Sequence, residues 1–133
     1  MIRLLASLTL VLLLTTPAGA QIVNFDAVAA APTSHQVLLE NESVRVLRVT
    51  IEPGATEPVH DHAWPSIMYF EKAQAITYIT YELKDGFPVE ARRMDAPAEA
   101  LTGAVSSPPE GLHAVQNRGT ETFTALRVEF KPQ

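Results

Sequence analysis

The 133-residue sequence contains no cysteine, so neither a disulfide bond nor a thiolate metal site can form in it. Basic residues are also few, with 10 Lys and Arg against 15 Asp and Glu, and they form no cluster. Because neutralising phosphates requires grouped basic side chains, this distribution argues against nucleic-acid binding. Without disulfides, the fold must be held by packing and hydrogen bonds, with a metal ion or a second subunit as further support.

The first 20 residues have the pattern of a secretory signal peptide. Arg3 gives a short positive start, an apolar run extends from Leu4 to Leu14, and Ala18-Gly19-Ala20 fits the cleavage pattern. The apolar run is too short for a transmembrane helix, which needs about 20 apolar residues. We therefore expect cleavage after Ala20, an exported protein that is periplasmic or secreted, and no membrane association afterwards. Without Arg3, nine basic residues remain against fifteen acidic ones.

The remaining chain is predicted to be one all-β domain. Residues 21–34 are rich in Ala, show no clear period and are predicted to be an extended N-terminal segment ahead of a domain over 35–133. No long amphipathic helix and no repeat is evident, and Lys84-Asp85-Gly86 is a hairpin signal. Many short strands separated by Gly and Pro turns favour a sandwich or a barrel. Strands are predicted over 36–40, 43–51, 57–62, 66–71, 74–83, 89–94, 101–105, 112–116 and 121–131.

His60-Asp61-His62 is the motif with the clearest chemistry. Residues two apart in a strand share a face, so His60 and His62 point the same way and Asp61 points oppositely. Two imidazoles on one face can bind one metal ion if a third ligand comes from elsewhere. His113, in a later predicted strand, is the histidine best placed to supply that ligand.

Two separated motifs resemble those of the cupin family of small β-barrels. The first cupin motif runs Gly, five residues, His-x-His, three or four residues and then Glu, which Gly54, His60 and His62 match. Ser66 stands where the glutamate is expected, and Ala73 stands where a closing glycine is expected.

The second cupin motif is matched in order, with one residue fewer between its second glycine and its histidine. The matching residues are Gly103, Pro109, Gly111, His113 and Asn117. The resemblance extends over roughly 37–130 and implies a jelly-roll barrel, or double-stranded β-helix.

The resemblance implies a divalent metal ion, Fe, Zn, Mn, Ni or Cu, held by His60, His62 and His113. Ser66 is a poor ligand, because a neutral hydroxyl binds a divalent ion more weakly than a carboxylate does. The implied site is similar to that of the three-histidine cupin dioxygenases and keeps at least one open coordination position. The alternative is a remnant of the fold, in which the histidines form only hydrogen bonds in a polar barrel mouth.

Other polar residues are weaker candidates for metal ligands or catalytic groups. Glu57, Asp61 and Glu71 could replace the missing carboxylate, but strand alternation turns all three away from His60. His35 is interpreted as a surface or lead-in histidine, and Glu57 and Glu110 are weak candidates for a general base.

Three function classes remain open from the sequence. The first is a metal-dependent enzyme, such as an oxygenase or isomerase, that acts on a small organic molecule. The second is a protein that binds a small ligand or a metal without turnover. The third is a structural or regulatory dimer with a degenerate metal site. A homodimer is expected, because Ile67 and Tyr69 lie on a face that requires covering by the N-terminal segment or a second subunit.

Overall fold

The computed structural model describes residues 23–133, so the predicted signal peptide lies outside the described residues and stays a prediction. Within this range no helix is long and apolar enough to cross a membrane. The described chain contains one α-helical turn, one 3₁₀ turn and a series of strands. They are α1 (Ala27–Ala30), β1 (His35–Glu40), β2 (Val44–Ile51), β3 (His60–His62), β4 (Ser66–Lys72), β5 (Ile76–Lys84), β6 (Phe87–Ala96), η1 (Ala98–Ala100), β7 (Ala104–Ser107), β8 (Glu110–Asn117) and β9 (Phe123–Phe130).

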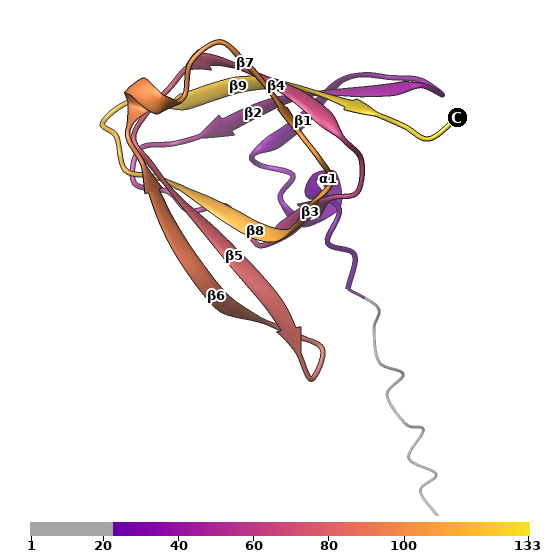
Figure 1. Cartoon of the computed structure of the whole chain (residues 1–133), viewed down its shortest axis with the longest axis horizontal. Helices are drawn as coiled ribbons and strands as arrows, with labels where there is room; N and C mark the ends of the chain where they lie inside the picture. The colour runs from indigo at the N-terminus through magenta and orange to yellow at the C-terminus, as the bar shows by residue number, and fades with distance from the viewer. Residues whose placement is uncertain (1–22) are drawn as a thin grey trace, which may run out of the picture.

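The strands form two antiparallel sheets that together make a jelly-roll barrel (Figure 1). The five-stranded sheet has the order β1-β2-β9-β4-β7, and the four-stranded sheet has the order β3-β8-β5-β6. Neighbours in each sheet are often far apart in the sequence, as when β9 lies between β2 and β4. The all-β jelly roll predicted from the sequence is therefore the observed fold, and its strands agree closely with the predicted ones.

The local sequence explains why β2 is a strand and why a tight turn follows β5. In β2 the charged and apolar residues Arg45, Leu47, Val49 and Ile51 are all buried, as expected of one strand face. Asp85 and Gly86 both have positive φ, 52° and 83°, which is the conformation that a two-residue hairpin turn requires. This turn joins β5 to β6, and the hairpin extends away from the barrel in Figure 1.

The apolar core lies between the two sheets. Val49 and Ile51 of β2, Phe123 and Ala125 of β9 and Ile76 of β5 form one buried cluster. Both sheets contribute to it, so burial of this cluster holds the sheets together without disulfides.

The N-terminal segment differs from its prediction, because it contains a helical turn and packs on the barrel. The Asp26 carboxylate caps α1 by accepting a hydrogen bond of 3.0 Å from the Val28 N–H. Ala27 and Ala31 are completely buried, since their small side chains allow close approach to the barrel. The Asp61 N–H donates to the Phe25 carbonyl at 2.7 Å, which fixes the segment beside β3.

Candidate metal centre

All four histidines of the chain lie together in one buried cluster. His35 begins β1, His60 and His62 form the ends of β3, and His113 lies in β8; none is more than 3% exposed. The ring centroid of His60 lies 4.6 Å from that of His35, 5.2 Å from that of His62 and 4.4 Å from that of His113. His60 is therefore the centre of the cluster.

The three histidines predicted as ligands are brought to one place by strand pairing. His60 lies directly opposite His113 across the β3–β8 ladder, and the rings of His62 and His113 have centroids 5.5 Å apart. Strand alternation places His60 and His62 on the inner side, while Asp61 pairs with Asp26 on the other side. Whether His60, His62 and His113 together bind a metal stays a prediction.

His35 is buried, which contradicts its interpretation as a surface residue. It lies opposite Val49 in the β1–β2 ladder, and Val49 faces the interior, so the His35 ring also points inward. One ring nitrogen from each of His35, His60 and His62 lies within 4.8 Å of the others. A bulge between Val37 and Leu39 then changes the register.

Each imidazole is anchored through its Nδ1 atom to a group that can only accept a hydrogen bond. The partners of Nδ1 are the Pro58 carbonyl for His60 at 2.8 Å, the Gly111 carbonyl for His113 at 2.8 Å and the Ala31 carbonyl for His35 at 3.3 Å. His62 is anchored in the same manner by the Glu129 carboxylate at 2.6 Å. Nδ1 must therefore carry the proton, and Nε2 keeps its lone pair for another partner.

Burial keeps these rings neutral. It lowers the pKa of His35 and of His60 to about 3, and it lowers the pKa values of His62 and His113 below their usual range. Mutual repulsion between the rings and the nearby positive charge of Arg127 act in the same direction on His62. Neutral imidazole is the form that coordinates metal ions, so protons do not compete for the cluster at neutral pH.

A buried carboxylate lies beside the cluster at a position that sequence reasoning missed. Glu129 of β9 is completely buried and lies directly opposite Ser66 of β4, on the inward face. It accepts from His62 Nδ1 and, at 2.5 Å, from Arg45 Nε. Ser66 is also buried, and its Oγ atom has no hydrogen-bond partner. The carboxylate absent at Ser66 is thus present on the neighbouring strand, where it orients a histidine.

A signal for Glu129 existed in the sequence. Arg127 and Glu129 continue the alternation of Phe123 and Ala125, so two charged residues follow the buried face of a strand. Buried charges require paired partners, and Arg45 is in the same position on β2. Arg45 in turn bonds to the Asp26 carboxylate at 2.7 and 3.0 Å, which links α1 to His62 through Glu129.

Glu57 faces the cluster, contrary to the prediction that it points away. β3 begins only at His60, so strand alternation does not extend back across Pro58 to Glu57. One Glu57 oxygen accepts a bond from the Val115 N–H at 3.1 Å, and the other lies 3.8 Å from His35 Nε2 without a hydrogen-bond partner. Burial raises the pKa of Glu57 to about 8, so its carboxyl group is mostly protonated at neutral pH. Glu71 is exposed and so is not part of the buried cluster, in agreement with the prediction that it faces away from His60.

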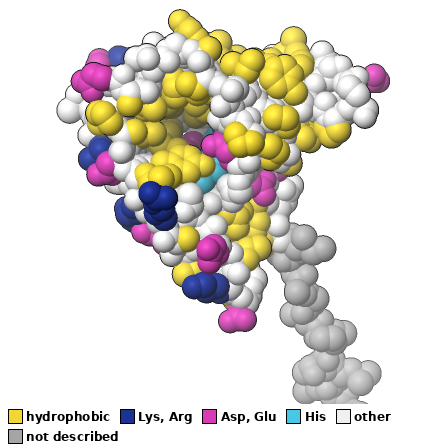
Figure 2. Space-filling view, viewed as in Figure 1, with side chains coloured by type: hydrophobic (Ala, Val, Ile, Leu, Met, Phe, Trp, Pro, Cys, Tyr) yellow, Lys and Arg dark blue, Asp and Glu magenta, His cyan; other side chains and the backbone are white. Residues whose placement is uncertain are grey.

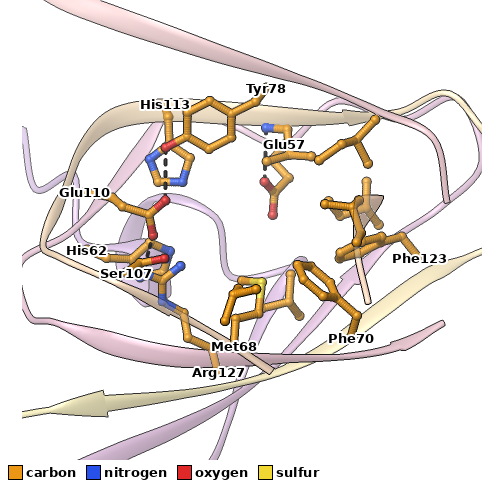
Figure 3. A pocket seen from close by; sticks show the side chains of 16 residues that line it. Glu57, His62, Met68, Phe70, Tyr78, Ser107, Glu110, His113, Phe123 and Arg127 are labelled. Carbon is orange, nitrogen blue, oxygen red and sulfur yellow. Dashed lines mark hydrogen bonds and ion pairs between the residues drawn. The ribbon is translucent and has the colours of Figure 1, made fainter. Parts of the chain in front are cut away.

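A cavity of about 180 Å³ opens beside His62 and His113 and has two chemically different ends. Figure 2 shows this hollow, with a histidine at its floor and hydrophobic side chains around it. In Figure 3 His62, Tyr78, Glu110 and His113 lie at one end of the cavity and Phe70 and Phe123 at the other, with Glu57 and Met68 between them. The lining residues that carry polar atoms in their side chains are Glu57, His62, Tyr78, Ser107, Glu110, His113 and Arg127, and the apolar ones are Val49, Ile51, Met68, Phe70, Ile76, Leu101, Val105, Val115 and Phe123.

The polar end is held rigidly by its own hydrogen bonds. The Tyr78 ring stacks on His113 with centroids 4.9 Å apart, and its hydroxyl donates to Glu110 at 3.1 Å. Glu110 also accepts from the Arg127 guanidinium, whose charge holds the pKa of this carboxyl group below its usual range despite the burial. The Glu110–Arg127 ion pair and the Tyr78 ring stacked on His113 therefore restrict how a ligand can enter this end.

Comparison with known proteins bears on the fold. No protein-family model matches the sequence, and no curated protein matches it either. Among solved structures, a cupin domain from Bordetella pertussis Tohama I aligns at 19% identity over 74% of this chain and 92% of that one, with a TM-score of 0.56. A Bacillus halodurans protein aligns at 14% identity over 75% of this chain and 71% of that one, with a TM-score of 0.53. The two-sheet topology and these structures agree, and the chain therefore has the cupin fold.

Proposed function

We propose that this protein binds a divalent metal ion at the histidine cluster, centred on His60 and His62. The observation that supports this most directly is the anchoring of each Nδ1 atom by a carbonyl or carboxylate oxygen. That arrangement sets the tautomer and the ring orientation, as the outer hydrogen bonds of histidine metal sites do. Imidazole nitrogens suit Zn, Cu, Fe and Ni, so the donor set fits a transition metal.

The cavity beside the cluster would receive a small molecule with a polar head and an apolar body. A cavity of about 150 Å³ can hold benzene, so about 180 Å³ suits a molecule of one ring or a short branched chain. The head would lie near His62 and His113, and the body against Phe70 and Phe123 (Figure 3). Neutral imidazoles leave the charge of the metal uncompensated, which favours an anionic oxygen in the head.

A reaction at this site would use Glu57. When bound, a divalent ion would polarise an oxygen of the ligand. The protonated Glu57 carboxyl group lines the same cavity, and its free oxygen is buried without a partner. It can donate a proton to a bound molecule and take one back, as a general acid and base does. We therefore favour an enzyme over a protein that binds without turnover, with export and a homodimer as further parts of the proposal.

Metal binding is tested by titrating chelator-treated protein with Zn²⁺ and Co²⁺ in a calorimeter. Wild type is expected to bind one ion per chain, and the double variant His60→Gln/His62→Gln is expected to bind none. Glu121→Gln, a change at an exposed side chain that pairs with Lys72, serves as the control and should bind as wild type does. Equal binding by the double variant would contradict the proposal.

Turnover is tested on the metal-loaded protein with small aromatic and branched aliphatic acids. Oxygen consumption and product formation are followed for wild type and Glu57→Gln. The enzyme hypothesis expects Glu57→Gln to bind metal normally and to lose turnover. A molecule that binds in the cavity and stays unchanged under all conditions would favour the binding alternative.

A further inference from the structure

We propose that His35, the first residue of β1, is a metal ligand that replaces the carboxylate missing at Ser66; this rests on the proposed metal binding. A ring nitrogen of His35 lies within 4.8 Å of ring nitrogens of both His60 and His62. Its ring contacts the His60 ring edge-on, with centroids 4.6 Å apart, and lies 5.3 Å from the His62 ring. Neither cupin motif in this sequence includes this histidine.

The surroundings of His35 leave its Nε2 atom available. Nδ1 is directed at the Ala31 carbonyl, and the polar atom recorded near Nε2 is Glu57 Oε1 at 3.8 Å, beyond hydrogen-bond distance. An ion bound between His35, His60 and His62 would take the Nε2 atom of His35 as a ligand.

The position of Ser66 explains why a carboxylate does not complete the site. Glu129 is one of the two cross-strand partners of Ser66, the other being Ser107, and the Glu129 oxygens are engaged by His62 and Arg45. A second carboxylate at position 66 would lie beside the first one in a buried place, where like charges repel. A neutral nitrogen from β1 avoids that repulsion.

The N-terminal segment is fixed in a way that orients His35. The Asp26 carboxylate bonds to Arg45, and the Thr50 N–H donates to the Ser34 carbonyl at 3.0 Å. The His35 N–H donates to the Ala31 carbonyl, also at 3.0 Å. These bonds set the backbone on both sides of His35 before any ion binds, so little ordering entropy remains to be lost.

The inferred ligands also indicate which side of the metal ion would remain free to bind another molecule. His62 and His113 line the cavity, while His35 and His60 do not. His35 and His60 would therefore close the site on its inner side, and a free coordination position would face the cavity. With His35, His60 and His62 as ligands, a four-coordinate metal keeps one position open for a bound molecule.

The deciding experiment compares Co²⁺ binding by wild type, His35→Gln and Ser34→Ala. Co²⁺ absorbs visible light, and the intensity and position of its bands depend on its ligands. His35→Gln is expected to lower Co²⁺ affinity at least tenfold and to change the spectrum, while Ser34→Ala, which alters the same segment but keeps the imidazole, leaves both unchanged. Wild-type affinity and an unchanged spectrum in His35→Gln would overturn the inference while metal binding itself stands.

A second measurement does not depend on the folding of a variant. In a crystal structure of Co²⁺-loaded wild type, the inference expects a His35 Nε2–metal distance of about 2.0–2.2 Å. An ion bound to His60 and His62 with His35 out of reach would overturn the inference alone. Wild type that binds no Co²⁺ at all would overturn both this inference and the proposed metal binding.

Discussion

Glu129 shows how one side chain can connect the charge balance of the barrel interior to the site. It is completely buried, and its carboxylate lies between Arg45 and His62, with Arg127 Nε 3.8 Å away. Removing one partner of such a buried network leaves the others uncompensated, which costs about 3–5 kcal/mol. Orienting groups of this kind also affect metal affinity, about 10- to 100-fold when they are lost.

We therefore predict that Glu129→Gln lowers the free energy of unfolding by about 3 kcal/mol or more and weakens Co²⁺ binding about 10- to 100-fold. The amide oxygen can still accept from His62, but it carries no charge to balance the arginines. Urea unfolding and Co²⁺ titration measure the two effects. Glu121→Gln is the control, because its exposed ion pair with Lys72 should contribute under 1 kcal/mol. A variant as stable as wild type would show that Glu129 does not balance these charges.

A substitution at Ser66 tests whether its hydroxyl group takes part in metal binding. Its Oγ atom is buried and makes no hydrogen bond, so Ser66→Ala removes an unsatisfied group. We predict unchanged metal affinity and a free energy of unfolding that is equal to that of wild type or about 1 kcal/mol higher. Calorimetric titration and urea unfolding would be compared with wild type. A tenfold loss of metal affinity would identify the hydroxyl as a ligand after all.

At the scale of elements, the N-terminal segment is a structural part of the barrel. Asp26 caps α1, bonds to Arg45 and pairs with Asp61, which joins the segment to two strands. We predict that Asp26→Ala lowers the free energy of unfolding by about 2 kcal/mol, from the lost cap and the lost ion pair together. Because His35 follows this segment, metal affinity should fall as well.

The control for Asp26 is Asn24→Ala. The Asn24 side chain accepts a bond from the Asp26 N–H but is exposed, so its removal should change stability by about 0.5 kcal/mol or less. Thermal unfolding of the metal-free protein distinguishes the two variants. If Asp26→Ala unfolds at the temperature of Asn24→Ala, the segment does not stabilise the barrel.

The strands were predictable because period-two alternation and turn residues act over short distances. The inward position of His60, His62 and Ser66 followed from that alternation. The inward positions of His35 and Glu57 did not follow from it. His35 is directed inward by its pairing with Val49, and Glu57 is not governed by strand alternation because β3 begins only at His60. Glu129 was missed for a related reason, since only the cross-strand register places it beside Ser66 and His62.

At the scale of the whole molecule, the outer face of the five-stranded sheet carries an apolar row. Leu39, Val46, Val128 and Ile67 are successive cross-strand partners on β1, β2, β9 and β4, so they share this face. Leu39 is 50% exposed, Ile67 is 42% exposed and the nearby Tyr69 is 52% exposed. An exposed apolar area across four strands is typical of an interface.

We predict that the protein sediments as a dimer and that Ile67→Lys shifts it towards the monomer, because a buried ammonium would disrupt an apolar interface. Sedimentation velocity over a range of concentrations measures this. Leu83→Lys is the control: Leu83 is 55% exposed near the tip of the β5–β6 hairpin, away from this sheet. A monomer at all concentrations would contradict the homodimer.

The buried titratable groups give the metal-free protein two opposing pH dependences. His35 and His60 have pKa values of about 3 in the folded protein, against 6.5 for a freely solvated imidazole, so the unfolded chain binds more protons over that range. Stability from these rings is complete above pH 6.5 and falls as the pH drops towards 3, by about 1.4 kcal/mol per unit for each ring. Glu57 acts oppositely, because its pKa is raised from 4.5 to about 8, and its contribution is lost as the pH rises from 4.5 to 8.

The free energy of unfolding of metal-free protein should therefore be greatest near pH 6.5. Below this pH the histidines outnumber Glu57, so the free energy should fall steeply, by a few kcal/mol between pH 6.5 and 4.5. Between pH 6.5 and 8 only the Glu57 contribution changes, and the free energy should fall more gently, by about 1–2 kcal/mol. Urea unfolding from pH 4.5 to 8.5 measures the whole curve. Glu57→Gln, which keeps a neutral side chain at every pH, should abolish the alkaline decline and leave the acid decline in place. An alkaline decline that persists in this variant would show that a group other than Glu57 causes it.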